Sequence, residues 1–278
     1  TFLTTVGDYR FLSGSFEGGR LRLSCFDGAH AFLFDAVASR NGMLRGDFWS
    51  RDSYHTTWIG NPDDKIELPD PFSISHWNSE VTLDSMAFTE PTQNGNGKRA
   101  ALGDERFHGK ARILQVFGSW CPNCHDETNY LKELHERYSK EGLSIAAVAF
   151  ELTGNSRKDL EQLSRYVARM AIPYPVLYGG VWSKEKATMT FGGLDRIHAY
   201  PTTIFFDQKG NPAAVYTGFT GPAAPIQHER LRASFDKIIQ SLLAGEPSPI
   251  GTPVELKGKD PAPKKPASKK PAPKKKVK

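Results

Sequence analysis

The residues best suited to chemistry are two cysteines separated by two residues, within the segment FGSWCPNCHDET (117–128). A C-x-x-C pair fits a redox dithiol or half of a zinc site, and C-x-x-C-H also fits a c-type haem attachment site. Here Cys121 and Cys124 are followed directly by His125. The motif alone leaves all three chemistries open, so the surrounding sequence has to decide between them.

The sequence around the motif favours the redox dithiol. ARILQVF (111–117) predicts a buried strand, and a helical pattern follows it. Pro122 suits the first helical position, where its missing N–H costs nothing. Cys121 would then lie at the positive end of the helix dipole, which stabilises a thiolate. Cys124, one turn deeper, is expected to be more buried and able to form a disulfide with Cys121. An exposed attacking thiol and a buried resolving thiol suit thiol–disulfide exchange.

Haem and zinc fit the sequence less well. A c-type haem needs an apolar pocket and a second axial ligand, and Met170 and Met189 already have places in helical patterns. A structural zinc site usually takes four ligands. The third cysteine, Cys25, lies about a hundred residues away, and His108 and His125 do not complete a known finger spacing. We therefore expect neither a metal nor a bound cofactor.

The elements that would position the dithiol alternate between strand and helix from about Trp77 onward. The expected strands are 111–117, 143–150, 202–207 and 213–219, and the expected helices are 122–140, 157–170, 182–191 and 226–243. This order predicts an α/β unit with a mixed central sheet flanked by helices.

The first 67 residues read instead as an all-β unit. RLRLSCF (20–26) alternates in polarity, which places Cys25 on an apolar face as a small core residue. Asn41-Gly42 is a strong hairpin signal between strands 30–37 and 43–50, and 54–60 predicts a further strand. We predict an antiparallel meander of four or five strands over 1–67, a Pro- and Asp-rich linker over 68–77, and the α/β unit over 78–245.

Charge is distributed very unevenly along the chain. Of 36 basic and 31 acidic residues, ten Lys and one Asp lie in 257–278, which leaves the remainder with 26 basic and 30 acidic residues and a net charge of −4. A net negative charge over residues 1–256 gives no sign of a nucleic-acid-binding surface. The Lys-, Pro- and Ala-rich stretch 246–278 predicts a disordered tail that could adhere to an anionic envelope surface.

The chain lacks the signals of a membrane span or a targeting leader. It has no run of 18 apolar residues, so no transmembrane helix is expected. It begins at Thr1 with neither Met nor an apolar leader, and we interpret it as a processed chain or a fragment.

A second motif makes a resemblance specific. Ala199-Tyr200-Pro201-Thr202-Thr203 precedes a predicted strand, and Glu127 follows the second cysteine by three positions. With the strand–WCPNC–helix unit, these residues make 78–245 similar to the thioredoxin superfamily, and within it to the TlpA/ResA-like thiol–disulfide oxidoreductases. Residues 1–67 also resemble the β-rich N-terminal regions of some members.

The resemblance implies a role for each matching residue. Cys121 would be the nucleophile, Cys124 the resolving thiol, and the two would form a redox-active disulfide. Pro201 would be a cis-proline facing the dithiol, and Glu127 would handle protons during exchange. The residues implied to contact the substrate are Trp120, Pro122, Tyr200 and Thr202.

Two positions depart from the family pattern. The family often has Pro where this chain has Asn129, so a helix kink there is in doubt. Many thioredoxins carry a buried Asp where this chain has Gln115. Because Gln115 cannot accept a proton, Glu127 or water would have to serve.

The sequence therefore predicts a periplasmic or other extracytoplasmic thiol–disulfide oxidoreductase, associated with the membrane or free, that reduces protein disulfides with electrons from a membrane-linked or soluble dithiol donor. One alternative is a peroxiredoxin-type thiol peroxidase, although Gly118 stands where that chemistry typically has Thr in T-x-x-C. The other alternative is an envelope-binding protein dominated by the β-unit and the basic tail.

Overall fold

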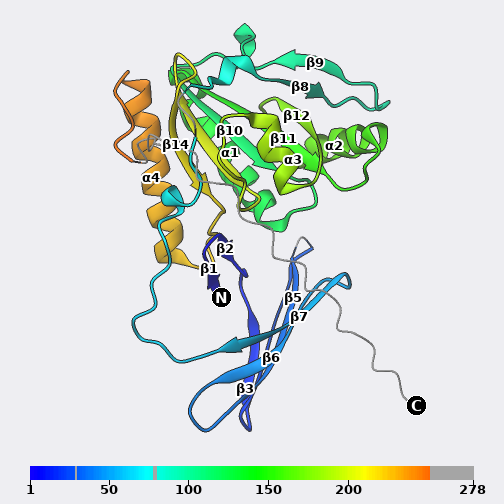
Figure 1. The fold of residues 1–278 in the computed structure, drawn as a ribbon, viewed down its shortest axis with the longest axis vertical. Coiled ribbons are helices and arrows are strands. Elements are labelled where there is room, and N and C mark those ends of the chain that lie inside the picture. Colours follow the sequence, from blue (N-terminus) through cyan, green and yellow to red (C-terminus); the bar gives the residue numbers. More distant parts are fainter. Residues whose placement is uncertain (29, 78–79, 251–278) are drawn as a thin grey trace, which may run out of the picture.

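The computed structural model describes residues 1–28, 30–77 and 80–250. Figure 1 shows a smaller antiparallel sheet near the N-terminus beside a larger sheet flanked by helices. The predicted fold class, a thioredoxin-like sheet preceded by a small all-β unit, is confirmed. Most of the predicted tail lies outside the described residues. Among the described residues, none of the helices has both the length and the apolar character of a membrane span.

The smaller sheet is a five-stranded meander in the order β3-β4-β5-β6-β7. Its strands are β3 (Ser13–Glu17), β4 (Arg20–Phe26), β5 (Ala31–Ala38), β6 (Leu44–Ser50) and β7 (Tyr54–Gly60). Gly42, in the predicted Asn-Gly turn, has a φ of 82°, which glycine adopts at no steric cost. The hairpin that pairs β5 with β6 is therefore confirmed, and β3 is an additional strand that the sequence reading missed.

One face of this sheet is aromatic. Phe34 and Phe48 lie opposite each other in the register of β5 and β6, with ring centroids 4.5 Å apart. Tyr9, upstream of the sheet, packs edge-on against both rings. Cys25 lies on β4 and is buried, in agreement with its prediction as a core residue. This aromatic packing gives the small sheet a core of its own.

The larger sheet has seven strands in the order β14-β13-β10-β11-β12-β8-β9. These are β8 (Ala87–Glu90), β9 (Lys98–Ala101), β10 (Ala111–Phe117), β11 (Leu143–Glu151), β12 (Val176–Val181), β13 (Thr202–Asp207) and β14 (Pro212–Thr217). Strands β10, β11 and β12 are parallel, and β13 runs antiparallel to β10. Strand β10, which leads to the dithiol, therefore lies in the middle of the sheet and is buried throughout.

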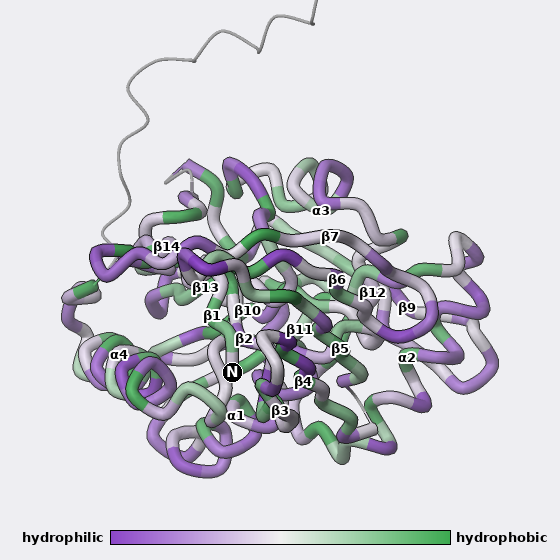
Figure 2. Tube along the Cα trace, turned by 90° about the horizontal axis from the view of Figure 1, so that it is seen from below, coloured by the Kyte–Doolittle hydropathy of each residue, from purple (hydrophilic) through white to green (hydrophobic). Residues whose placement is uncertain are grey.

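Four helices complete this unit, namely α1 (Pro122–Tyr138), α2 (Ser156–Met170), α3 (Lys184–Phe191) and α4 (Pro225–Leu243). Tyr130 of α1 packs against Phe235 of α4, and Tyr166 of α2 packs against Phe117 of β10. Phe191 of α3 packs against Phe150 of β11. Figure 2 shows α4 with alternating hydrophobic and hydrophilic stretches, as an amphipathic helix requires.

The sequence reading missed strands β8, β9 and β12. Strand β12 contains Gly179 and Gly180, which weaken its strand pattern. Strands β8 and β9 have four residues each and form the edge of the sheet. Their pairing depends on neighbours far away in sequence, which a local pattern does not reveal.

The N-terminal segment contacts the chain that follows strand β14 of the larger sheet. A short hairpin of β1 (Leu3–Thr4) and β2 (Gly7–Asp8) precedes the meander, and the Val6 carbonyl accepts a hydrogen bond from the Phe219 N–H at 3.2 Å. Within the predicted linker, Trp77 is buried and packs edge-on against Phe206. The predicted domain boundaries stay a prediction, and the N-terminal unit also contacts helix α1 through an ion pair between Arg10 and Asp126.

Candidate active site

The two cysteines of the motif lie where the central strand passes into helix α1. Cys121 is the N-cap residue, Pro122 occupies the first turn, and the Cys124 N–H nitrogen lies 3.4 Å from the Cys121 Sγ. The cysteines are joined as a disulfide with their Cα atoms 5.3 Å apart. Cys121 is 5% exposed and Cys124 is fully buried, so the expected difference in exposure is present but small in the oxidised pair.

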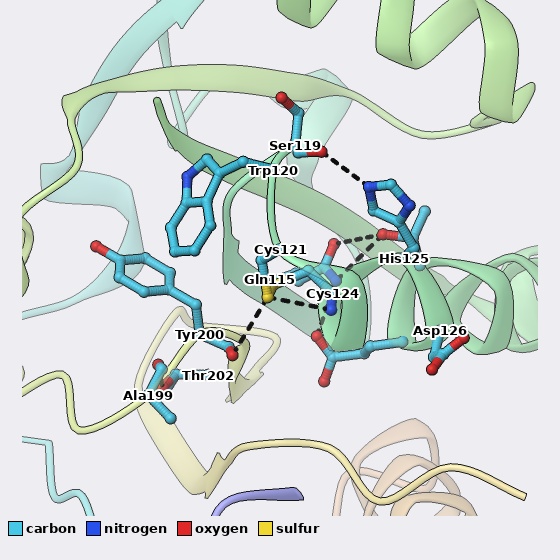
Figure 3. Close-up of a disulfide and its surroundings, with 12 residues drawn as sticks. Gln115, Ser119, Trp120, Cys121, Cys124, His125, Asp126, Ala199, Tyr200 and Thr202 are labelled. Atoms are coloured by element: carbon cyan, nitrogen blue, oxygen red, sulfur yellow. Dashed lines mark hydrogen bonds between the residues drawn. A yellow bond between two sulfur atoms is a disulfide. The ribbon is translucent and has the colours of Figure 1, made fainter. Parts of the chain in front are cut away.

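A cis-proline loop faces the disulfide. The Tyr200–Pro201 peptide bond is cis, and the Cys121 Sγ lies 3.4 Å from the Tyr200 carbonyl oxygen. Figure 3 shows the Tyr200 carbonyl directed at this sulfur. The Thr202 hydroxyl donates to the Ala199 carbonyl at 2.9 Å and so closes the loop on itself. The backbone of this loop thus lies next to the sulfur that would react.

Glu127 lies one turn beyond Cys124 on α1 and is fully buried. One of its carboxyl oxygens accepts from Gln115 Nε2 at 2.8 Å and the other from the Thr203 hydroxyl at 2.5 Å. Burial raises its pKa from 4.5 to about 7, against the opposing effect of these two hydrogen bonds. Glu127 is therefore an acid that can hold or release a proton near neutral pH, and it is not a solvated helical side chain.

The residue at position 115 takes part in the same group. Gln115 is fully buried on β10 and its amide donates to Glu127. Its uncharged side chain keeps a second ionisable group out of this site. The chain therefore carries its buried acid on the helix and an amide on the strand.

Trp120 and Tyr200, both predicted to contact substrate, form an aromatic group beside the dithiol. Their ring centroids are 5.7 Å apart, and Trp182, which the sequence reading did not single out, packs edge-on against Trp120 at 5.6 Å. Trp120 Nε1 donates to the Phe150 carbonyl at 2.9 Å, which fixes the ring. Trp120 and Tyr200 flank Cys121 on the side of the cis-proline loop (Figure 3).

A buried carboxyl that the sequence reading missed anchors the loop before the dithiol. Glu151, at the end of β11, accepts from the Ser119 N–H at 2.9 Å and from the Ser119 hydroxyl at 2.7 Å. Burial raises its pKa, and Gln162 of α2 lies 3.4 Å from the same carboxyl group. The available signal was an acidic residue closing the otherwise apolar strand LSIAAVAFE.

His125 points away from the disulfide. Its Nε2 lies 2.8 Å from the Ser119 carbonyl oxygen, which Figure 3 shows on the far side from Tyr200. Because a carbonyl only accepts, this nitrogen carries the proton. Burial lowers the pKa of His125, so the ring is mostly neutral at pH 7 and supports the loop. Among the described residues, no cluster of three or more His, Cys, Asp or Glu could hold a metal ion.

A C-x-x-C pair at a helix N-terminus, beside a cis-proline that precedes the neighbouring strand of a mixed sheet, is the arrangement of the thioredoxin superfamily. The profile of the Redoxin family matches residues 83–225, about half of the chain. The chain therefore belongs to the Redoxin family.

Curated relatives carry a more specific name. The chain is 27% identical over 122 residues to "Thiol-disulfide oxidoreductase ResA" of Geobacillus thermodenitrificans, a match that covers 44% of this chain and 62% of that protein. It is 26% identical over 148 residues to the ResA protein of Geobacillus kaustophilus, covering 49% of this chain and 78% of that one. The chain thus spans less than two thirds of the length of the first of these relatives.

A solved structure of similar kind is a thiol:disulfide interchange protein of the thioredoxin family from Chlorobium tepidum. It is 22% identical, with a TM-score of 0.38, and the match covers 58% of this chain and 97% of that one.

Proposed function

We propose that this chain is an extracytoplasmic thiol–disulfide oxidoreductase that reduces disulfides of protein substrates. The observation that carries the proposal is the Cys121–Cys124 pair at the N-terminus of α1, facing the cis-proline loop. The relatives named ResA support the type of reaction. The resemblance to TlpA/ResA-like proteins supports the location outside the cytoplasm.

The reaction begins with the reduced pair. The Cys121 thiolate, stabilised by the N-terminus of α1, attacks one sulfur of the substrate disulfide. The substrate S–S bond breaks, its second sulfur leaves as a thiolate that takes a proton, and a mixed disulfide with Cys121 forms. The backbone at Tyr200, next to the Cys121 sulfur, is placed to pair with an extended substrate segment.

Cys124 completes the transfer. Its thiol loses a proton, and the thiolate attacks the Cys121 sulfur, which releases the second substrate thiolate and forms the Cys121–Cys124 disulfide. Two electrons have then passed from the dithiol to the substrate, and a dithiol donor restores the reduced pair. We assign Glu127, one turn after Cys124 and with a pKa near 7, as the group that accepts the Cys124 proton.

Single substitutions of the three cysteines test this mechanism in an insulin-reduction assay with dithiothreitol as donor. Cys121→Ser is expected to abolish activity, and Cys124→Ser to accumulate a mixed disulfide between Cys121 and the substrate, visible by mass spectrometry. Cys25→Ser is the matched control and should retain activity, because Cys25 is buried in the other unit. Full activity in Cys121→Ser would refute the mechanism, and peroxide consumption that survives Cys124→Ser would favour a peroxidase.

We also propose that the basic segment 257–278 binds an anionic envelope surface. Its ten lysines and single aspartate would attract an anionic envelope surface, at about 1 kcal/mol per lysine near the surface. Co-sedimentation of the full chain with phosphatidylglycerol vesicles tests this, with a chain ending at residue 250 as control. We expect salt-sensitive binding of the full chain alone, and equal binding of both chains would contradict it.

A further inference from the structure

The turn between β6 and β7 reaches the active site from the smaller sheet. Arg51 lies in this turn with a φ of 56°, and its N–H donates to the Ala31 carbonyl at 2.8 Å. Its guanidinium Nη2 donates to the Trp120 carbonyl at 2.9 Å. That carbonyl belongs to the peptide group that joins Trp120 to Cys121. A side chain from the N-terminal unit is therefore held beside the residue proposed as nucleophile.

Within residues 1–28, 30–77 and 80–250, Arg51 forms no ion pair, whereas several other arginines do. The neighbouring Asp52 is exposed and forms none in the same part of the chain. Arg51 itself is exposed, so its remaining donors face solvent next to the dithiol.

The field of Arg51 acts on the first turn of α1. The pKa of His125, four residues after Cys121, is lowered mainly by burial, and the positive charges of Arg169 and Arg51 lower it further. A positive charge that disfavours a cation at this position favours an anion there. The anion that the proposed reaction creates on this turn is the Cys121 thiolate.

Arg169 of α2 also acts on His125, and its guanidinium lies over the Tyr166 ring. The remaining charged and titratable groups around this turn have partners of their own. Glu127 is hydrogen-bonded in the core, His125 is bonded to Ser119, and Asp126 pairs with Arg10 at 3.2 Å. Asp27, which also acts on His125, pairs with Arg10 and His30. In the part of the chain that the structure describes, Arg51 is therefore the arginine whose guanidinium is hydrogen-bonded to the loop that carries the dithiol.

We propose that Arg51 is a positioning residue that stabilises the Cys121 thiolate, so that the N-terminal β-unit completes the active site. The role of Arg51 in thiol–disulfide exchange rests on the proposed function. The hydrogen bond to Trp120 fixes the loop, and the guanidinium adds its charge to the dipole of α1. A unit charge at such close range, partly screened by solvent, changes the thiolate fraction by roughly threefold to tenfold.

The test measures the Cys121 pKa in the full reduced chain, from the pH dependence of its alkylation by iodoacetamide followed by mass spectrometry. Arg51→Gln is expected to lower the alkylation rate at pH 7 about threefold to tenfold by raising this pKa. Arg51→Lys keeps the charge and should react nearly as the native chain does. Arg45→Gln is the matched control, because Arg45 is an exposed arginine near the opposite end of β6.

A native-chain measurement covers the case in which Arg51→Gln fails to fold. Raising the salt concentration from about 0.05 to about 1 M screens an exposed guanidinium and should raise the Cys121 pKa of the native chain. An unchanged pKa in a folded Arg51→Gln variant, an equal shift in Arg45→Gln, or no salt effect on the native chain would overturn the inference. Alkylation needs no turnover, so its result is distinct from the insulin assay, whose failure would overturn the proposed function alone.

Discussion

At the scale of single residues, the site combines a thiol at a helix terminus with a carboxyl group whose ionisation is opposed by burial. Cys121 gains from the partial positive charge of α1, while Glu127 is shielded from solvent by the helix and the sheet. Gln115 and Thr203 both donate to Glu127 and so hold its carboxyl in one orientation. The Cys121 thiolate is thus stabilised by its position at the helix N-terminus, whereas ionisation of Glu127 is opposed by burial.

The first prediction concerns Glu127 and the pH dependence of stability. Its pKa is raised in the folded state, so its stabilising contribution is complete below about pH 4.5 and is lost as the pH rises through about 7. With the pKa raised from 4.5 to about 7, the loss at pH 8 is on the order of 3 kcal/mol. Glu127→Gln removes this dependence.

Urea unfolding at several pH values measures this effect. The stability of Glu127→Gln relative to the native chain should increase between about pH 4.5 and 8. The amide introduced by this substitution can still accept from Thr203, and the Gln115 amide can turn to pair with it, so the comparison reports charge. A difference between the two chains that does not change with pH would contradict a raised Glu127 pKa.

At the scale of elements, the end of β11 holds the loop that carries the dithiol. Glu151 binds both the N–H and the hydroxyl of Ser119, and the Phe150 carbonyl binds the Trp120 indole. The position of the dithiol thus depends on a parallel strand next to β10. Distortion of this strand end would move the loop without touching either cysteine.

The second prediction follows from Glu151. Glu151→Ala leaves the buried Ser119 N–H and hydroxyl without their acceptor, which should cost about 2–4 kcal/mol of unfolding free energy. Glu151→Gln keeps an oxygen acceptor and is the control. Urea unfolding checks the cost, and the rate of insulin reduction should fall in Glu151→Ala more than in Glu151→Gln. Equal stability of the two variants would show that Glu151 does not anchor the loop.

The sequence predicted those elements whose signals are local. Strand β10, helix α1 and the Asn41-Gly42 hairpin each carry their pattern within about twenty residues, and each was found close to its observed bounds. Strands β8 and β9 are short edge strands whose pairing depends on distant partners, so local patterns did not reveal them. Glu151 and Arg51 were missed for the same reason, because their partners lie 32 and 69 residues away.

At the scale of the whole molecule, the N-terminal unit is attached next to the dithiol and not at a remote surface. Asp8 is 6% exposed and its carboxyl accepts from the Gly221 N–H at 2.5 Å and from the Arg10 N–H at 2.6 Å. Arg10 in turn pairs with Asp126 on α1. These contacts tie the chain before the meander to the helix that carries the dithiol.

The third prediction concerns this attachment. Asp8→Ala leaves the Gly221 N–H without its acceptor and should destabilise the junction by about 1–3 kcal/mol. Asp8→Asn keeps an oxygen acceptor and should lose less. Limited proteolysis between the two units should accelerate in Asp8→Ala, and an unchanged cleavage rate would contradict this role of Asp8. If Arg51 acts as inferred, the Cys121 pKa should also rise in this variant, because the β6–β7 turn would leave Trp120.

The central claim is that Cys121 and Cys124 form a reversible dithiol–disulfide couple in a reductase. The measurement that tests it most directly is the reduction potential of this pair, read by thiol alkylation and mass spectrometry after equilibration in glutathione and dithiothreitol buffers. We predict a two-electron couple at or below about −220 mV. A potential near about −120 mV would instead indicate a disulfide-forming enzyme, and the absence of any reversible couple would contradict thiol–disulfide exchange altogether.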